Sequence, residues 1–448
     1  MPGTIEASVV IPVFNQWRLT RQCLEALAGT TAGESVEVIV IDNASTDETA
    51  QACPALGGGL FGGRFVYRRA EKNLNFGPAS NLGARIARGA ALIFLNNDTE
   101  PLPGWYRPLL RDLDEIPDVA ATGPVLLYPD GGRDGAGDDG RNGRPGRRSL
   151  FGRTVQHLGV YVTPFLSVGH LYEGIPGDSP LAKKRRFFQI ITAACMAMRA
   201  DLFRQAGGFD ERYVNGFEDV DLCARLWSRG LRMTVNPDSR VVHLTSQTAG
   251  RYGHDAENSR LLAQNAQPLL APDLHVHVAN DGLRLALCPW QRLRPALPKP
   301  LADRLRRFLP GDGARADREA LTRLLTLNPY WDAGLESLAA HSASPAARRS
   351  VLEYAVALLH RPEDNLALHA LCRETGDNAR ADRCLKAARA VADPFAAFLA
   401  AAQAGAGWCA SIGLDDVAAL YRDWLARADE IRQSVHEPFM RRLKEVRR

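Results

Sequence analysis

Three short apolar runs near the start of the chain constrain its fold more than any other feature. They lie at residues 8–13, 36–41 and 90–95, and none of them alternates between apolar and polar residues. Such a run is typical of a strand that is buried on both faces, although a buried helical segment can show the same pattern. Apolar residues at helical spacing lie between the runs, at 18–28 and 79–90. This alternation predicts an α/β domain with a doubly wound parallel sheet and right-handed crossovers.

Polar residues follow each run, at the point where the strand would end. Asn15 follows the first run, Asp42 the second, and Asn96-Asn97-Asp98 the third. Open α/β sheets bind their ligands at the carboxyl ends of the strands. A carboxylate flanked by amides there is suited to a divalent metal and its phosphates, but a strand that ends in an Asn/Asp turn gives the same pattern. Asp42 is suited either to accept from the imide N–H of a uracil or thymine ring or to cap the next helix.

The end of the first strand and one later histidine provide further candidates. The sequence Ile-Pro-Val-Phe-Asn can seat a flat base against backbone and side chain, and it contains Pro12, Val13 and Phe14 next to Asn15. His243 lies on a predicted closing strand. A single histidine in such a place is more often structural than a ligand, so the pattern alone leaves both roles open.

Three carboxylates open a predicted helix at residues 219–230. They are Glu218, Asp219 and Asp221, and like charges this close are costly to bury together, although a helix N-terminus offsets part of the cost. An ordinary acidic first turn accounts for them. Beside a metal–phosphate site, however, one of them would be a natural general base.

Composition excludes several classes of protein. With 46% hydrophobic and 24% charged residues the chain reads as a soluble globular protein of two or three domains, and its net charge of +4 gives no general affinity for nucleic acid. The cysteines form no CxxC pair, which leaves zinc and redox motifs unsupported and suits a reducing cytoplasm. No apolar run approaches the roughly 20 residues of a spanning helix, and the first residues lack the pattern of a signal peptide. We therefore expect a cytoplasmic protein that is not integral to a membrane.

Basic residues cluster in three places: around 141–153, at 183–186 and in the final residues 441–448. Such runs are usually solvated surface. They also fit a peripheral contact with an anionic inner-membrane surface.

The remainder of the chain divides by composition. Residues 130–152 are rich in glycine and predict a flexible loop; strand-like pieces follow at 157–162, an apolar buried stretch at 187–198, and a helix that Asp201 would cap. Closing strands are expected at 231–235 and 240–243. We predict a first domain over 1–280, a basic proline-containing linker over 281–312, and a helical domain over 313–448, in which residues 362–394 resemble one tetratricopeptide helix pair, although a plain helical bundle fits equally well.

Taken together, five runs resemble a family 2 glycosyltransferase of the GT-A fold. They are SVVIPVFNQ, VEVIVIDNASTDET, EKNLNFGPASNLGARIARGAALIFLNNDTEPLPGW, ITAACMAMRADLFRQAGGFDERYVNGFEDVDLCARLWSRG and VVHLTSQT. They occur in the family's order, between Ser8 and about residue 259. The resemblance is greatest to the rhamnosyltransferase-like branch, which builds bacterial surface polysaccharide and lipopolysaccharide. It implies a doubly wound mixed sheet, here followed by an all-α domain.

The resemblance also implies roles for single residues. Asp219 would be the catalytic base with Glu218 in support, and Asp98 and His243 would bind Mg²⁺ or Mn²⁺. Asn96 stands where the family often has the first acid of an Asp-x-Asp motif, and an amide oxygen is a weaker ligand. Nucleotide-sugar contacts would come from Pro12, Val13, Phe14, Asn15, Asp42, Asn73, Gly77, Asn81, Asn96 and Asn97.

The function that the resemblance implies is inverting transfer of a sugar from a UDP- or dTDP-linked donor to a hydroxyl of a saccharide or lipid-linked acceptor. An alternative is a weakly active or inactive transferase-fold protein that acts as a scaffold through its helical domain, by binding a protein partner or a second copy. A nucleotidyltransferase would need a glycine-rich basic loop near the N-terminus, and the sequence IPVFNQW has none.

Overall fold

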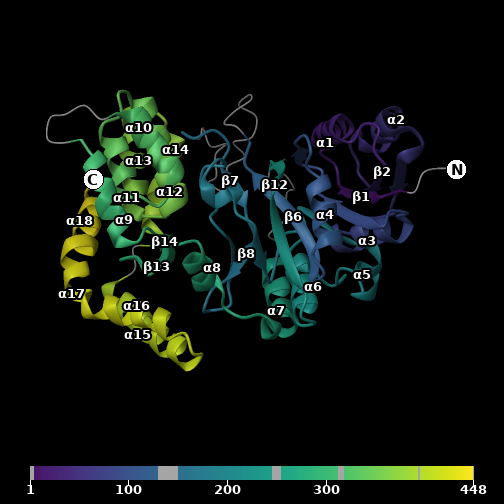
Figure 1. The fold of residues 1–448 in the computed structure, drawn as a ribbon. Coiled ribbons are helices and arrows are strands. Elements are labelled where there is room, and N and C mark those ends of the chain that lie inside the picture. Colours follow the sequence, from purple (N-terminus) through teal and green to yellow (C-terminus); the bar gives the residue numbers. More distant parts are fainter. Residues whose placement is uncertain (1–4, 130–149, 245–253, 311–316, 392–393, 447–448) are drawn as a thin grey trace. The chain divides into compact units, whose positions relative to one another are not determined.

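The computed structural model describes residues 5–129, 150–244, 254–310, 317–391 and 394–446 (Figure 1). Most of the predicted glycine-rich loop therefore lies outside the described residues. The chain divides into two compact units, each described by itself below. The first comprises Met1–Pro129, Val155–Glu173 and Ala182–Pro272; the second comprises Asp130–Thr154, Gly174–Leu181 and Asp273–Arg448.

The first unit begins with the strands and helices that the apolar runs predict. Four parallel strands lie in the order β3-β2-β1-β4, and β1, β2 and β4 are buried along their whole length. These elements are β1 (Ala7–Val13), α1 (Trp17–Thr30), β2 (Val36–Asp42), α2 (Thr49–Phe61), β3 (Phe65–Arg69), α3 (Phe76–Ile86) and β4 (Ala91–Leu95). The predicted α/β class is confirmed, and its cause is local, because each buried strand is a continuous apolar run.

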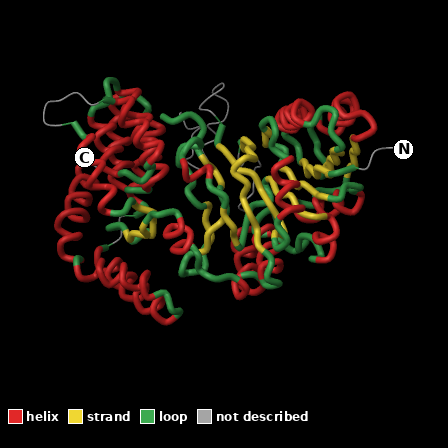
Figure 2. Tube along the Cα trace, in the orientation of Figure 1, coloured by secondary structure: helices red, strands yellow, loops and turns green. Residues whose placement is uncertain are grey.

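The other half of the sheet makes it mixed (Figures 1 and 2). Next to β4 lies β11, which is antiparallel to β4 and to β6; β12 then runs parallel to β6 and antiparallel to β10. Two short strands, β5 and β7, pair with β12 and β6. The bounds are β5 (Thr99–Pro101), β6 (Val119–Leu127), β7 (Val155–His157), β10 (Arg186–Phe188), β11 (Cys195–Arg199) and β12 (Arg232–His243), while β8 (Val160–Val162) and β9 (Val168–His170) form a separate pair.

Three details differ from the sequence expectations. The two closing strands are one strand, β12, whose register with β6 shifts between Asn236 and Arg240. The buried stretch at 187–198 is divided between β10 and β11. Asp201 does not cap α5 (Ala200–Gln205). The N-cap is Arg199, the last residue of β11, whose backbone is extended, and Asp201 lies in the first turn of the helix.

Helices cover both faces of the sheet. The apolar faces of α1 and of α4 (Arg107–Glu115) pack on the odd-numbered residues of β1 and β4. On the other face α3 approaches β1 so closely that a Cβ on Gly83 would lie 2.3 Å from a methyl group of Val10. The unit is completed by α6 (Glu218–Trp227) and α7 (Asp255–Asn265).

The second unit is predominantly helical, as predicted. Its helices are α8 (Leu274–Asn280), α9 (Lys299–Leu305), α10 (Arg318–Leu327), α11 (Asp332–Ala340), α12 (Pro345–Leu359), α13 (Pro362–Glu374), α14 (Asn378–Arg389), α15 (Phe395–Ser411), α16 (Asp415–Ala426), α17 (Ala428–Ile431) and α18 (Glu437–Glu445). The predicted helix pair corresponds to α13 and α14, joined by a turn in which Gly376 has φ 80°. Among the described residues, no helix is long and apolar enough to cross a membrane.

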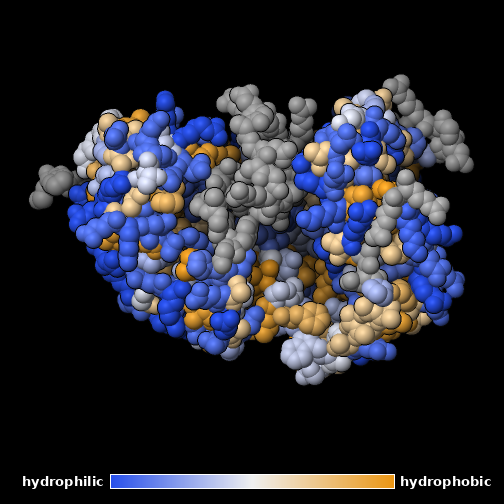
Figure 3. Space-filling model, turned by 180° about the vertical axis from the view of Figure 1, so that it is seen from behind, coloured by the Kyte–Doolittle hydropathy of each residue, from blue (hydrophilic) through white to orange (hydrophobic). Residues whose placement is uncertain are grey.

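The stretch expected to be a linker holds regular structure. Strands β13 (Arg284–Leu287) and β14 (Leu293–Ala296) form an antiparallel hairpin, and α9 follows. Leucines of the hairpin pack on the apolar cluster of α15 and α16, which explains why this proline-containing segment is ordered. On the face that Figure 3 shows, the surface is mostly hydrophilic, and apolar residues are most frequent along the lower part of the view.

Candidate functional site

The pairing of β5 with β12 brings Asp98 and His243 together. The two strands are antiparallel, and His243 lies opposite Thr99. As a result, Asp98 Oδ1 lies 3.1 Å from His243 Nε2, although the residues are 145 positions apart in sequence. Asn96 also reaches this point, since its Nδ2 lies 3.4 Å from the same ring nitrogen. Asp98 and His243 are both buried, at 8% and 6% exposure, so the pair is held within the protein.

The donor set fits a divalent cation. Neighbouring ligands of an octahedral Mg²⁺, each at about 2.1 Å from the metal, lie about 3.0 Å apart. The separation of Asp98 Oδ1 and His243 Nε2, 3.1 Å, is close to this value, and it is also the distance of a hydrogen bond between the two side chains. Within the described part of the chain, no group of three or more His, Cys, Asp or Glu side chains is arranged around a metal position. A site with Asp98 and His243 as ligands suits an ion whose other ligands are water and phosphate oxygens.

Gln156 contacts the other side of the His243 ring. Its Oε1 lies 2.6 Å from His243 Nδ1, and its Nε2 donates to the backbone carbonyl of His243 at 3.4 Å. Gln156 is on β7 and did not feature in the sequence prediction. No local pattern marks it, because the contact depends on how β7 and β12 are placed around β6.

The carboxylate of Asp219 is anchored near the end of β4. Its Oδ2 accepts from the backbone N–H of Ala193 at 2.9 Å, and its Oδ1 accepts from the N–H of Val220 at 2.9 Å. The neighbouring Ala194 accepts from the backbone N–H of Asn96 at 2.9 Å. Residues 193 and 194 thus link the first turn of α6 to the segment that carries Asp98.

Glu218, the first residue of α6, lies near the start of α3. A Cβ added to Gly77 would come within 4.0 Å of the Glu218 Cβ and 3.5 Å of the Phe209 Cβ. The predicted residues Gly77, Glu218 and Asp219 are therefore grouped around the start of α6. Phe217, immediately before the helix, has φ 69° and turns the chain into it.

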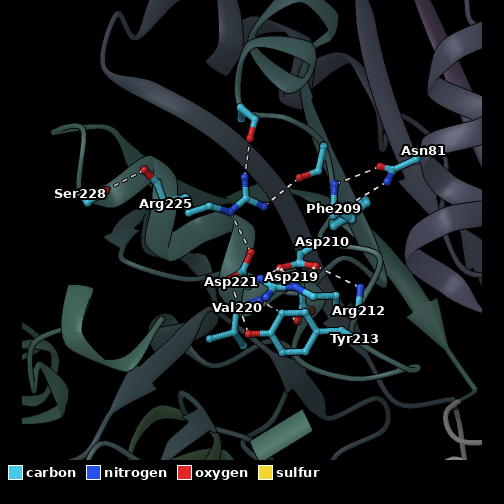
Figure 4. A network of polar contacts seen from close by, with 12 residues as sticks. Asn81, Phe209, Asp210, Arg212, Tyr213, Asp219, Val220, Asp221, Arg225 and Ser228 are labelled. Atoms are coloured by element: carbon cyan, nitrogen blue, oxygen red, sulfur yellow. Dashed lines mark hydrogen bonds and ion pairs between the residues drawn. The ribbon is translucent and has the colours of Figure 1, made fainter. Parts of the chain in front are cut away.

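Arg225 holds α6 in place (Figure 4). Its Nε donates to Asp221 Oδ2 at 2.8 Å, and its two terminal nitrogens donate to the backbone carbonyls of Ala206 and Gly208. Asp221 is 2% exposed. Of the three acids that open the helix, Asp221 thus faces an arginine within the protein.

Three other residues of the predicted nucleotide-sugar site, Asn15, Asn81 and Asn97, make hydrogen bonds with the protein itself. Asn81 Oδ1 accepts from the backbone N–H of Phe209 at 3.0 Å, and its Nδ2 donates to the carbonyl of the same residue at 2.9 Å, so Asn81 fixes the loop before α6 (Figure 4). Asn15 Oδ1 accepts from the N–H of Thr46 at 2.7 Å. Asn97 Nδ2 donates to Thr20 Oγ1 at 2.9 Å. The structure places these three side chains in structural contacts.

Asp42 ends β2 and is completely buried. Its Oδ1 accepts from the N–H of Ser45 at 2.8 Å, while its Oδ2 accepts from Tyr67 Oη at 2.5 Å and Arg69 Nη1 at 2.9 Å. Burial and the bond to Asp42 raise the pKa of the Tyr67 hydroxyl. Arg69 lies opposite Asp42 in the β2–β3 register, a pairing that sequence reasoning missed.

The remaining predicted contacts lie at the ends of β1 and before α3. Pro12 and Val13 are buried in β1, where Val13 pairs with Asp42, and Phe14 is half-buried beyond the strand. Asn73 is exposed, and its Oδ1 accepts from the N–H of Asn75 at 2.9 Å. The nucleobase and sugar contacts stay predictions.

Comparison with known proteins adds the family. Residues 8–169 match the model of the glycosyl transferase family 2. This part of the chain is thus similar to family 2 glycosyltransferases. The O-antigen biosynthesis protein RfbC of Myxococcus xanthus is 30% identical over 298 residues, which are 63% of this chain and 21% of RfbC. The N-acetylglucosaminyl-diphospho-decaprenol L-rhamnosyltransferase of Mycobacterium tuberculosis (strain ATCC 25618 / H37Rv) is 28% identical over 48% of this chain and 69% of its own.

The chain covers only 21% and 26% of the length of the first two curated relatives.

Solved structures resemble the fold loosely. GalNAc-T7, solved with UDP, GalNAc and Mn²⁺, is 18% identical with a TM-score of 0.42 over 53% of this chain and 43% of its own. The mannosyltransferase PcManGT of Pyrobaculum calidifontis, in complex with GDP-Man and Mn²⁺, is 18% identical with a TM-score of 0.39 over 86% of each chain.

Proposed function

We propose that this glycosyltransferase moves a sugar from a UDP- or dTDP-linked donor to a hydroxyl group of a saccharide or lipid-linked acceptor, with inversion at the anomeric carbon. The observation that carries the proposal is the Asp98–His243 pair, with 3.1 Å between Oδ1 and Nε2. It lies one backbone segment away from the anchored carboxylate of Asp219. The residues proposed to hold the metal and the candidate base thus belong to the same unit.

Each residue of the site has a separate role in the proposed reaction. Asp219 takes the proton of the acceptor hydroxyl, and the oxygen then attacks the anomeric carbon from the face opposite the leaving diphosphate. A single catalytic carboxylate is sufficient for this inversion, unlike glycoside hydrolysis, which uses an acid and a base. Asp98 and His243 would hold Mg²⁺ or Mn²⁺, which when bound neutralises negative charge on the leaving group. The backbone N–H of Ala193 keeps the Asp219 carboxylate oriented.

The relatives support the choice of acceptor class. Two of them are named for O-antigen biosynthesis and for rhamnosyl transfer to a decaprenol-linked sugar. We therefore place the reaction in the synthesis of a cell-envelope polysaccharide or lipopolysaccharide.

The test is a screen of UDP-, dTDP- and GDP-sugars with Mn²⁺, in which release of the nucleoside diphosphate is measured with saccharide and lipid-linked acceptors. Asp219→Asn should abolish transfer and leave donor binding nearly unchanged. Asp201→Asn is the matched control, because Asp201 is also in the first turn of a helix of this unit but is exposed. Wild-type turnover in Asp219→Asn would refute the assignment of the base.

The alternative is a scaffold whose transferase domain has little activity. The amide of Asn96 favours it, because this side chain contacts His243 where relatives often have an acid. In that case the wild-type protein would turn over no donor with Mn²⁺, and its helical unit would bind a protein partner or a second copy of the chain. Light scattering of the purified chain would detect the second copy. Turnover that depends on Asp219 would exclude this alternative.

We also propose that the protein contacts an anionic membrane surface peripherally. Around the end of α9, Arg304, Arg306 and Arg307 are exposed, and the aromatic ring of Phe308 is 44% exposed beside the Arg307 guanidinium. Cations next to an exposed aromatic ring suit a layer of acidic headgroups. The protein should co-sediment with phosphatidylglycerol vesicles at low salt, and Arg306→Glu/Arg307→Glu should not. Equal sedimentation with uncharged phosphatidylcholine vesicles would count against the proposal.

A further inference from the structure

Gln156 occupies an irregular position in the sheet. Strand β7 pairs antiparallel with β6, with His157 opposite Leu126 and Val155 opposite Leu127. Gln156 therefore has no residue of its own opposite it and is the extra residue of a β-bulge. A bulge bends the strand locally and redirects a side chain, and bulges are frequent next to active sites.

The redirected side chain binds His243 at two points. Its Nε2 lies 3.4 Å from the backbone carbonyl oxygen of His243, and its Oε1 lies 2.6 Å from ring atom Nδ1. A carbonyl oxygen can only accept, so the amide NH₂ must face it and the amide oxygen must face the ring. An amide oxygen also only accepts, so Nδ1 must carry the proton. The two contacts together define the amide orientation and place a proton on Nδ1, which leaves Nε2 as the ring atom that can bind a cation.

In the Nδ1–H tautomer, the lone pair of Nε2 faces the candidate metal position. The Asn96 amide nitrogen lies 3.4 Å from Nε2 and can donate to it when Nε2 is unprotonated. Asp98 Oδ1 is an acceptor 3.1 Å from Nε2, which is the distance of a hydrogen bond from a protonated Nε2, and a bound cation would take the place of that proton between the two atoms. Histidines that bind metals usually donate their other ring N–H to such a partner, which fixes the ring and its tautomer.

We propose that Gln156 is a positioning residue, which holds His243 in the Nδ1–H tautomer so that Nε2 can bind a divalent cation. The inference rests on the proposed function, in which Asp98 and His243 hold the metal. Gln156 and His243 are 5% and 6% exposed, so water cannot easily replace the amide. Loss of such a partner typically weakens metal binding 10- to 100-fold.

A purely structural role for Gln156 predicts a different result. Removal of the amide would then lower stability and leave metal affinity unchanged. The chain offers a matched control in Gln189, which is 3% exposed and also makes two contacts with a single residue: its Nε2 donates to the Ala271 carbonyl at 2.6 Å, and its Oε1 accepts from the Ala271 N–H at 2.9 Å. Gln189→Met should therefore lower stability without an effect on the metal.

The experiment compares wild type, Gln156→Met, Gln156→Glu and Gln189→Met as full-length chains, with folding checked by circular dichroism. The Kd for Mn²⁺ is measured by electron paramagnetic resonance, with and without UDP. We expect about a 10- to 100-fold weaker Kd for Gln156→Met, and a Kd close to wild type for Gln156→Glu, which keeps the acceptor, and for Gln189→Met. A wild-type Kd in Gln156→Met overturns the proposal. If Gln156→Met does not fold, Gln156→Ala replaces it.

A second measurement separates this inference from the proposed function. The ¹⁵N shifts of the His243 ring, assigned by comparison with His243→Gln, report the tautomer without metal or turnover. Wild type should show a protonated Nδ1, because Gln156 Oε1 accepts from it, and Gln156→Met should show Nδ1 with that proton lost in part or in full. If wild type binds no Mn²⁺, the metal site fails, and these shifts alone decide whether Gln156 sets the tautomer. Identical shifts in the two proteins overturn the positioning role.

Discussion

Arg225→Met should strongly destabilise the first unit, because Arg225 joins α6 to the loop before it. In the native protein, Arg225 pairs with Asp221 at 2.8 Å and donates to the carbonyls of Ala206 and Gly208 (Figure 4). Asp221 is only 2% exposed, so its carboxylate would be left buried without a countercharge. Breaking a buried ion pair from one side costs about 3–5 kcal/mol. The Arg225 side chain is 27% exposed, and screening by water should reduce the loss to about 2–3 kcal/mol.

The assay is urea denaturation of the full-length chain, with hydrogen exchange of peptides from residues 200–230 to assign the transition to this unit. Arg212→Met is the control, because the Arg212 guanidinium pairs with Asp210 at the surface and its loss should have no measurable effect. The double variant Arg225→Met/Asp221→Leu should recover part of the loss, since no buried charge remains. A loss below about 1 kcal/mol for Arg225→Met, or a double variant no more stable than the single one, would refute the reasoning.

Three further predictions concern packing, pH and metal. Gly83→Ala should lower the free energy of unfolding by about 1–3 kcal/mol, because the added Cβ would overlap Val10. Gly58→Ala adds its Cβ in open space on α2 and should raise the free energy of unfolding by about 0.5–1 kcal/mol. Urea unfolding midpoints would compare the two variants. Burial lowers the pKa of His436 below 6.5, so the unfolded chain takes up this proton first as the pH falls. The stability that depends on neutral His436 should be fully present above about pH 6.5 and should be lost as the pH falls below it. The melting temperature of His436→Phe should fall less over the same pH range. EDTA should stop sugar transfer and Mn²⁺ restore it, and full activity in chelator would contradict a metal at Asp98.

Much of the first unit could be predicted from the sequence. The runs that became β1, β2 and β4 are continuous apolar segments, and their pattern is local, so it survives without knowledge of the partner strands. By contrast, β6 contains Gly123 and Pro124, residues that usually indicate a turn. It is nevertheless a central strand, because Pro124 lies beside the shift in register with β12 and Gly123 lies against β11, where a Cβ would come within 3.1 Å of the Cys195 carbonyl.

At the candidate site too, the sequence identifies some residues, and only the structure shows how others act. The sequence, with the resemblance that it carries, was sufficient to single out Asp98, His243 and Asp219, since each stands at a recognisable position in a motif. Only the tertiary structure showed that Asn81 holds the loop before α6 and that Gln156 holds the ring of His243. These contacts join residues 87 to 128 positions apart, and periodicity along the chain contains no information about pairs so distant. The residue types at the strand ends follow from the local sequence, whereas the packing of strands and helices brings particular ones into contact.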